Sequence, residues 1–127
     1  MGFEPRNADE VTRFFGVRWD DAGTLRLTVR PEYLNPVGFL SGVAAFTLVD
    51  YSMASALIEQ MTPDERCATL NVSIQYLRTA REGDIVCRTT VDRRTRSNAA
   101  LRSEVVDDDG NVLCTAVGTY AIFAARA

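Results

Sequence analysis

The sequence predicts an α+β fold in which one antiparallel sheet wraps around a single buried helix. Two observations predict it: the order of the elements and the apolar character of the one long helix. A short helix and two short strands come first, the long helix follows, and four strands end the 127-residue chain. Strands on one side of a single helix indicate two packed layers. Because no repeat, low-complexity tract or linker interrupts this order, we expect one domain over residues 1–127.

The elements before the long helix are short. Leu25, Leu27 and Val29 alternate with polar residues, the pattern of a half-buried strand, and Pro31 ends that strand. Gly16 is a stop signal for the first helix. The expected elements are a helix at 8–15 with Asn7 as its N-cap, strands at 17–19 and 24–29, and a turn at 20–23.

The long helix is expected from Gly42 to Met61, with Ser41 as its N-cap. Apolar residues lie on nearly every face between Val43 and Ile58, and a helix that is apolar all round is buried all round. A sheet covers only one side of it. The other side needs a second chain, so we expect a homodimer.

Antiparallel strands account for the rest of the chain. Turn residues at 81–83 separate the first two of them, and the Asp-rich turn at 107–111 joins the last two as a hairpin. The four strands are expected at 68–77, 84–92, 100–106 and 112–124.

Missing residue types exclude several chemistries. The chain has no histidine and all 14 of its basic residues are arginine, which excludes Ser-His and Cys-His catalysis and lysine Schiff bases. The chain has three cysteines, an odd number, and they are widely spaced, at Cys67, Cys87 and Cys114. This pattern suggests buried reduced thiols rather than disulfides or a zinc site. Carboxylates remain as the main acid-base groups.

Charge and hydropathy bear on partners and location. A net charge of −3 argues against a nucleic-acid partner, which needs clustered positive charge. The first ten residues lack the apolar run of a signal peptide, and the longest mostly apolar stretch, 43–49, is far shorter than the ~20 residues that span a bilayer. We expect a cytoplasmic protein that does not bind membranes.

Asp50 is the most informative residue. Apart from Glu32, it is the only charged residue between Arg30 and Glu59, and it lies too deep in the helix to act as an N-cap. A buried carboxylate must be paired or hydrogen-bonded. Two interpretations follow: a catalytic carboxylate, or an ion pair with an arginine of a strand or of a second chain.

Gly42 stands at the expected start of the long helix. Helix N-termini present free N–H groups and the positive end of the helix dipole, which suits a carbonyl oxygen that becomes an oxyanion. The alternative is that Gly42 serves only the backbone geometry at the start of the helix.

These residues belong to a recognisable pattern. The stretch NPVGFLSGV at 35–43, followed by Asp50, resembles the hotdog thioesterases of the phenylacetate-degradation and 4-hydroxybenzoyl-CoA type. Their pattern is asparagine, two residues, glycine, two residues, histidine-glycine-glycine, and then an acidic residue in the helix. Similar stretches at 15–16, 30–32, 70–78 and 83–84 extend the resemblance over roughly residues 10–124.

The resemblance implies a fold, an assembly and an activity. The fold is a curved antiparallel sheet around the long helix, assembled as dimers that often pair into tetramers. The activity is hydrolysis of acyl-CoA or aryl-acyl-CoA thioesters, with no cofactor apart from the CoA of the substrate. By position, Asp50 is the nucleophile or general base, Gly42 N–H polarises the carbonyl, Asn35 lies beside the carbonyl and the water, and Thr69 orients the water.

Two residues depart from the family pattern. Ser41 stands in place of the histidine and Val43 in place of the second glycine. Ser41 can still cap the helix, and Val43 would narrow the acyl pocket. These changes leave a non-catalytic acyl-CoA-binding protein as the alternative, whereas a hotdog hydratase would need the missing histidine.

Arginine suits the phosphates of CoA because it binds them through two hydrogen bonds. Arg93, Arg94 and Arg96 precede Ser97, and Arg78 and Arg81 follow an expected strand. The alternative for both groups is a solvated strand end or turn.

Overall fold

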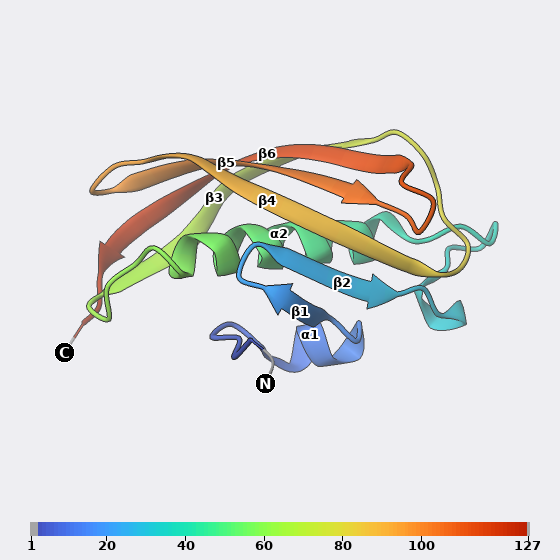
Figure 1. Cartoon of the computed structure of the whole chain (residues 1–127), viewed down its shortest axis with the longest axis horizontal. Helices are drawn as coiled ribbons and strands as arrows, with labels where there is room; N and C mark the ends of the chain where they lie inside the picture. The colour runs from blue at the N-terminus through green and yellow to red at the C-terminus, as the bar shows by residue number, and fades with distance from the viewer. Residues whose placement is uncertain (1–2, 127) are drawn as a thin grey trace.

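The computed structural model describes residues 3–126 and has a six-stranded antiparallel sheet in the order β1-β2-β4-β5-β6-β3. The sheet curves around α2, as Figure 1 shows, and this arrangement confirms the expected hotdog fold. The elements are α1 (Glu10–Phe14), β1 (Arg18–Asp21), β2 (Thr24–Thr28), a 3-10 turn (Pro31–Tyr33), α2 (Gly42–Ile58), β3 (Glu65–Tyr76), β4 (Asp84–Arg94), β5 (Asn98–Val106) and β6 (Val112–Ala124).

Asp9, not Asn7, caps α1, so the expected N-cap is wrong. The Asp9 carboxylate accepts a hydrogen bond from Thr12 N–H, and the Thr12 hydroxyl accepts one from Asp9 N–H. This reciprocal pair is a capping box, which satisfies two free donors and fixes the start of the helix. The Asn7 amide instead donates to the carbonyl of Tyr51 on α2, at 3.1 Å.

The long helix begins where expected and ends three residues early. The Ser41 hydroxyl accepts from Val43 N–H at 3.2 Å, which confirms the N-cap. At the other end, Arg6 donates to the Ile58 carbonyl at 2.7 Å and Arg94 to the Gln60 carbonyl at 2.8 Å. These cationic side chains bond carbonyls at and just beyond the C-terminal end of the helix, where acceptors lack helical partners.

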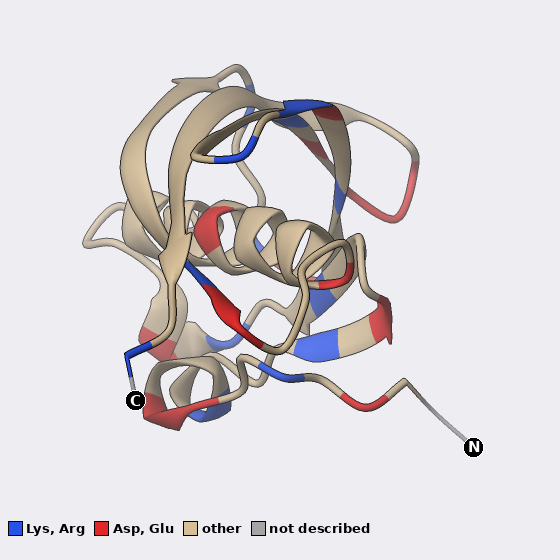
Figure 2. Cartoon of the chain, turned by 90° about the vertical axis from the view of Figure 1, so that its left-hand side faces the viewer, with Lys and Arg blue, Asp and Glu red and all other residues tan. Residues whose placement is uncertain are grey.

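The sheet packs closely on the helix because β6 carries a glycine at the point of contact. A Cβ atom added to Gly118 would lie only 2.6 Å from the sulfur of Met53, which is fully buried in α2. Glycine therefore permits the close approach of strand and helix. Figure 2, seen along the helix, shows the sheet arching over α2, with charged residues mainly on loops and strands outside the enclosed space.

One stripe of α2 is left uncovered within the single chain. Val43 is 66% exposed, and Phe46 and Asp50 are partly exposed along the same side of the helix. The stripe lies next to β3, an edge strand that pairs with β6 on one side only and whose Leu70 is 58% exposed. Burial on every face, expected from the apolar sequence, thus holds for most of α2 but not for this stripe.

Candidate active site

Asp50 is held by two hydroxyl groups. Thr69 Oγ1 of β3 donates to Asp50 Oδ1 at 2.8 Å. The Tyr120 hydroxyl of β6 donates to the same oxygen at 2.5 Å and also bonds the Asp50 carbonyl at 2.8 Å. Among the residues that the structure describes, none donates to Oδ2. One carboxylate oxygen is therefore fixed in place, and the other is free to accept a proton or to attack.

The strand register brings the two hydroxyls together. Thr69 and Tyr120 are direct partners across the β3–β6 ladder, and the ladder shifts register just after Thr69. Thr69 was expected beside the reacting water, and the structure places it against Asp50. Tyr120 was not anticipated. A signal was present, since Tyr120 alternates with Gly118 and Ile122 on the buried face of the last strand, and a buried tyrosine hydroxyl needs a partner.

Asp50 makes no ion pair with any arginine of residues 3–126. The interpretation of Asp50 as the partner of an arginine in its own chain is therefore not supported within these residues. Burial, and then the bond to Asp50, raise the pKa of Tyr120, which keeps this hydroxyl a proton donor. Burial and the nearby Asp50 charge also raise the pKa of Cys67, so this thiol is neutral near pH 7 and is a poor nucleophile.

Gly42 lies at the open N-terminus of α2. Within the described residues, no group accepts a hydrogen bond from its N–H, and the residue is exposed. The Tyr76 hydroxyl donates to the Gly42 carbonyl at 2.9 Å, and a Cβ atom on Gly42 would lie 3.3 Å from the Tyr76 ring. The absence of a side chain thus lets Tyr76 rest against the start of the helix while the N–H stays accessible.

Asn35 organises the loop that leads to the helix. Its side-chain oxygen accepts from Val37 N–H and Phe39 N–H, both at 3.1 Å, which forms an Asx turn. Gly38, at φ +88°, completes the turn in a conformation that favours glycine. This arrangement uses the carboxamide oxygen and leaves the NH₂ group for a substrate or water.

Gly42 and Asp50 are not brought together within one chain. Eight residues of helix separate them, which is ~12 Å at ~1.5 Å per residue. The chain therefore carries two half-sites: Asp50 with Thr69 and Tyr120, and Gly42 with Ser41 and Tyr76.

The candidate phosphate-binding arginines separate into two groups. Arg94 forms an ion pair with Glu65 and bonds the Gln60 carbonyl, so it ties β4 to the end of α2. Arg93, Arg96 and Ser97 are exposed near the β4–β5 turn. At the opposite end of α2, Arg78 borders a cavity next to Gly42, and Arg81 stacks 4.5 Å from the centre of the Phe39 ring.

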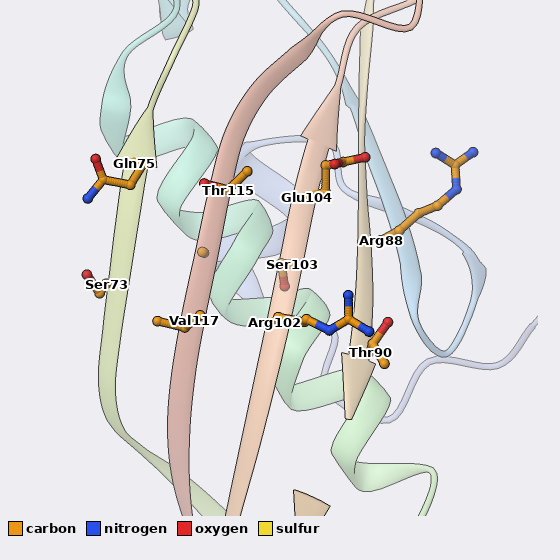
Figure 3. A pocket seen from close by; sticks show the side chains of 10 residues that line it. Ser73, Gln75, Arg88, Thr90, Arg102, Ser103, Glu104, Thr115 and Val117 are labelled. Atoms are coloured by element: carbon orange, nitrogen blue, oxygen red, sulfur yellow. The ribbon is translucent and has the colours of Figure 1, made fainter. Parts of the chain in front are cut away.

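A hollow of about 540 Å³ lies on the outer face of the sheet (Figure 3). Arg88, Arg102 and Glu104 border it together with small polar side chains of β3 and β6. The strand register points these residues away from α2, on the other face of the sheet from the Tyr120 hydroxyl that bonds Asp50. This hollow is therefore separate from the candidate active site.

Neither a membrane-spanning helix nor a cluster of metal ligands is found in residues 3–126. No described helix combines the length and the apolar character needed to cross a membrane. Within residues 3–126, no three His, Cys, Asp or Glu side chains gather as metal ligands would.

Comparisons with known proteins agree on the fold. A thioesterase from Pseudomonas aeruginosa, solved as a mutant, superposes with a TM-score of 0.86 at 22% identity over 92% of this chain and 88% of that one. A phenylacetic acid degradation-related protein from Ralstonia eutropha gives 0.79 at 28% identity over 90% of each chain. A Bacillus halodurans protein solved with CoA gives 0.86 at 18% identity over 93% of this chain and 78% of that one.

The sequence itself assigns the family. No curated protein sequence matches the chain. Residues 37–114 match the thioesterase superfamily, and this segment is more than half of the chain and contains Gly42, Asp50 and Thr69. The protein is a member of the thioesterase superfamily.

Proposed function

We propose that the protein hydrolyses acyl-CoA thioesters to a free acid and CoA, with Asp50 as the catalytic carboxylate. The observation that carries the proposal is the carboxylate itself, fixed through Oδ1 by Thr69 and Tyr120 while Oδ2 is left free. Membership of the thioesterase superfamily supports the reaction class. The CoA in the Bacillus halodurans structure supports the thiol part of the substrate.

The chemistry needs a base and an oxyanion site. Asp50 Oδ2 takes a proton from water, and the water oxygen bonds to the thioester carbon. The carbonyl oxygen becomes an oxyanion held by Gly42 N–H, an interaction of ~3 kcal/mol or more for one donor. Collapse of this intermediate breaks the C–S bond, and the CoA sulfur leaves with the proton that Asp50 holds. Direct attack by Asp50 on the carbonyl is the other role open to the same oxygen.

A homodimer completes this site. The partly exposed stripe of α2 lies next to the edge strand β3, and each carries an exposed apolar side chain, Val43 at 66% and Leu70 at 58%. A long unpaired edge strand favours pairing with another chain. Twofold packing on this surface sets two α2 helices antiparallel, so that Gly42 of one chain approaches Asp50 of the other. Pairing of such dimers into tetramers remains a prediction.

Exposed arginines lie at both ends of α2 and are available to the phosphates of CoA. Arg78, beside Gly42, and the group Arg93, Arg96 and Ser97 are the candidates for its phosphates, since their side chains are exposed. Arg94 is already paired with Glu65, so we expect it to contribute to CoA binding only by holding the neighbouring Arg93 and Arg96 in place. We place the reaction in the cytoplasm, where CoA thioesters are available.

The experiment is a measurement of thiol release from a panel of acyl-CoAs by the wild type and Asp50→Asn. Hydrolysis by the wild type and its loss in the variant are expected. A non-catalytic acyl-CoA-binding protein is the second candidate, because the Ser41 hydroxyl that replaces the family histidine is used to cap the helix. Stabilisation by acyl-CoA without thiol release would favour that candidate.

A further inference from the structure

An apolar cavity of about 170 Å³ lies between the start of α2 and the sheet. Its inner wall consists of Ala45 of α2, Ile85 of β4, Val105 of β5, and Leu113 and Cys114 of β6, all of which are buried. Leu40, Ser41, Gly42, Tyr76, Arg78, Thr79 and Ala80 complete its lining nearer the surface.

The cavity adjoins the proposed oxyanion donor. A second, more open hollow is lined by Val43 and Phe46, and both spaces share Ser41, Gly42 and Tyr76. Tyr76 is anchored at this junction by its hydroxyl bond to the Gly42 carbonyl. A group that enters the cavity from the open hollow therefore passes next to Gly42.

The size and chemistry of the cavity define what fits. An apolar cavity of roughly 150 Å³ holds one benzene molecule, so this cavity, which opens to the surface beside Tyr76 and Arg78, has room for about six carbon atoms. The inner wall offers no strong hydrogen-bonding side chain, since Cys114 is the only member with a polar atom and a thiol is a weak partner. Burial raises the pKa of Cys114 to about 11, so the wall carries no charge near neutral pH.

We infer that this cavity is the acyl pocket and that it takes an apolar acyl group of about six carbons. The inference rests on the proposed function and specifies its substrate class. A linear hexanoyl group and an unsubstituted six-membered ring both meet the requirement. A ring with a hydroxyl at its far end does not, because that hydroxyl would be buried against Ile85 and Val105 without a partner.

Binding of hydrolysis-resistant thioethers tests the pocket without the reaction. Calorimetry with S-methyl-CoA and S-hexyl-CoA should show the hexyl compound binding at least about 100-fold tighter, since each buried methylene contributes roughly fourfold. Ala45→Leu and Cys114→Met each fill part of the cavity. Each should lower this preference below about tenfold while affinity for S-methyl-CoA is unchanged.

Thr115→Met is the matched control, because Thr115 is next to Cys114 on β6 but borders the hollow on the outer face. It should leave the preference intact. An unchanged hexyl preference in folded Ala45→Leu and Cys114→Met proteins would overturn the inference, as would equal affinities of the wild type for the two compounds. The affinity for S-phenethyl-CoA, compared with that for S-hexyl-CoA, distinguishes a ring from a chain. The 4-hydroxy derivative of S-phenethyl-CoA should bind more weakly than its parent, and equal binding of these two compounds would contradict the apolar wall.

If both filled variants unfold, a crystal structure of the wild type with S-hexyl-CoA decides. A hexyl chain beside Cys114 supports the pocket, and a chain lying only between Val43 and Phe46 overturns it. Tight S-hexyl-CoA binding without hydrolysis of any acyl-CoA would instead defeat the proposed function and leave the pocket standing.

Discussion

The Tyr120 hydroxyl shares its one proton between two oxygens of Asp50, Oδ1 at 2.5 Å and the backbone carbonyl at 2.8 Å. The tyrosine therefore fixes both the side chain and the backbone of the one carboxylate in the middle of α2. Because Thr69 donates to the same Oδ1, Oδ2 is the oxygen left free for the reaction that we propose. Rigid support of this kind positions a catalytic group before the substrate arrives.

Loss of the carboxylate should abolish most activity. We expect Asp50→Asn to lower kcat at least ~100-fold, the scale of a positioned base or nucleophile. The amide retains the acceptor for Thr69 and Tyr120, so the melting temperature should change little. Asp92→Asn is the control, since Asp92 pairs with Arg102 on the surface at 2.8 Å. Near-normal kcat in a folded Asp50→Asn protein would sink the assignment.

Tyr120→Phe tests the positioning role. It removes both hydrogen bonds to Asp50 and leaves the ring in the core, so we expect kcat to fall about tenfold, the worth of one hydrogen bond to a charged group. KM should stay nearly constant, because the hydroxyl is buried against Asp50 and is not one of the groups that we propose for CoA binding. Tyr51→Phe is matched to it, because Tyr51 donates to Asp9 at 2.6 Å. Equal kcat values in the two variants would show that the Tyr120 hydroxyl is only structural.

The activity should have a single acidic limb. Activity should stay level across roughly pH 6 to 8, because no histidine is present to titrate in that range. The raised pKa of Cys67, the thiol near Asp50, moves its titration above this window. Two well-resolved ionisations below pH 8 in the profile of kcat/KM, with a substrate that does not titrate there, would contradict a single-carboxylate mechanism.

Two buried thiols should make the fold sensitive to alkali. Burial raises the pKa of Cys87 and of Cys114 to about 11. A free thiol titrates near pH 8.5, so between about pH 8.5 and 11 the unfolded state binds fewer protons than the folded state. Stability must then fall as pH rises, by up to ~1.4 kcal/mol per pH unit for each thiol. Urea unfolding from pH 8 to 10.5 measures the slope, and Cys114→Ala should reduce it. An identical slope in the variant would contradict this origin.

The parts of the site that lie within one segment were predictable. Gly42 stands out because it starts the long helix, and Asp50 because it is the one charged residue within that helix. The Ser41 cap follows from the preference for serine at helix N-termini. Tyr120 depends on the register of two strands that are far apart in the sequence, which local patterns do not encode.

The last prediction is that each active site is shared between two chains. The ~12 Å of helix between Gly42 and Asp50 is longer than one side chain can bridge, so a carbonyl held at one cannot be attacked with help from the other in the same chain. Two inactive proteins, Asp50→Ala and Gly42→Pro, should therefore complement each other. Random exchange makes half of the dimers mixed, and each mixed dimer has one intact site, so activity returns to roughly a quarter of the wild type. Native mass spectrometry verifies the exchange, and each variant alone supplies the background. Mixed dimers without recovered activity would place both groups in one chain and defeat this arrangement.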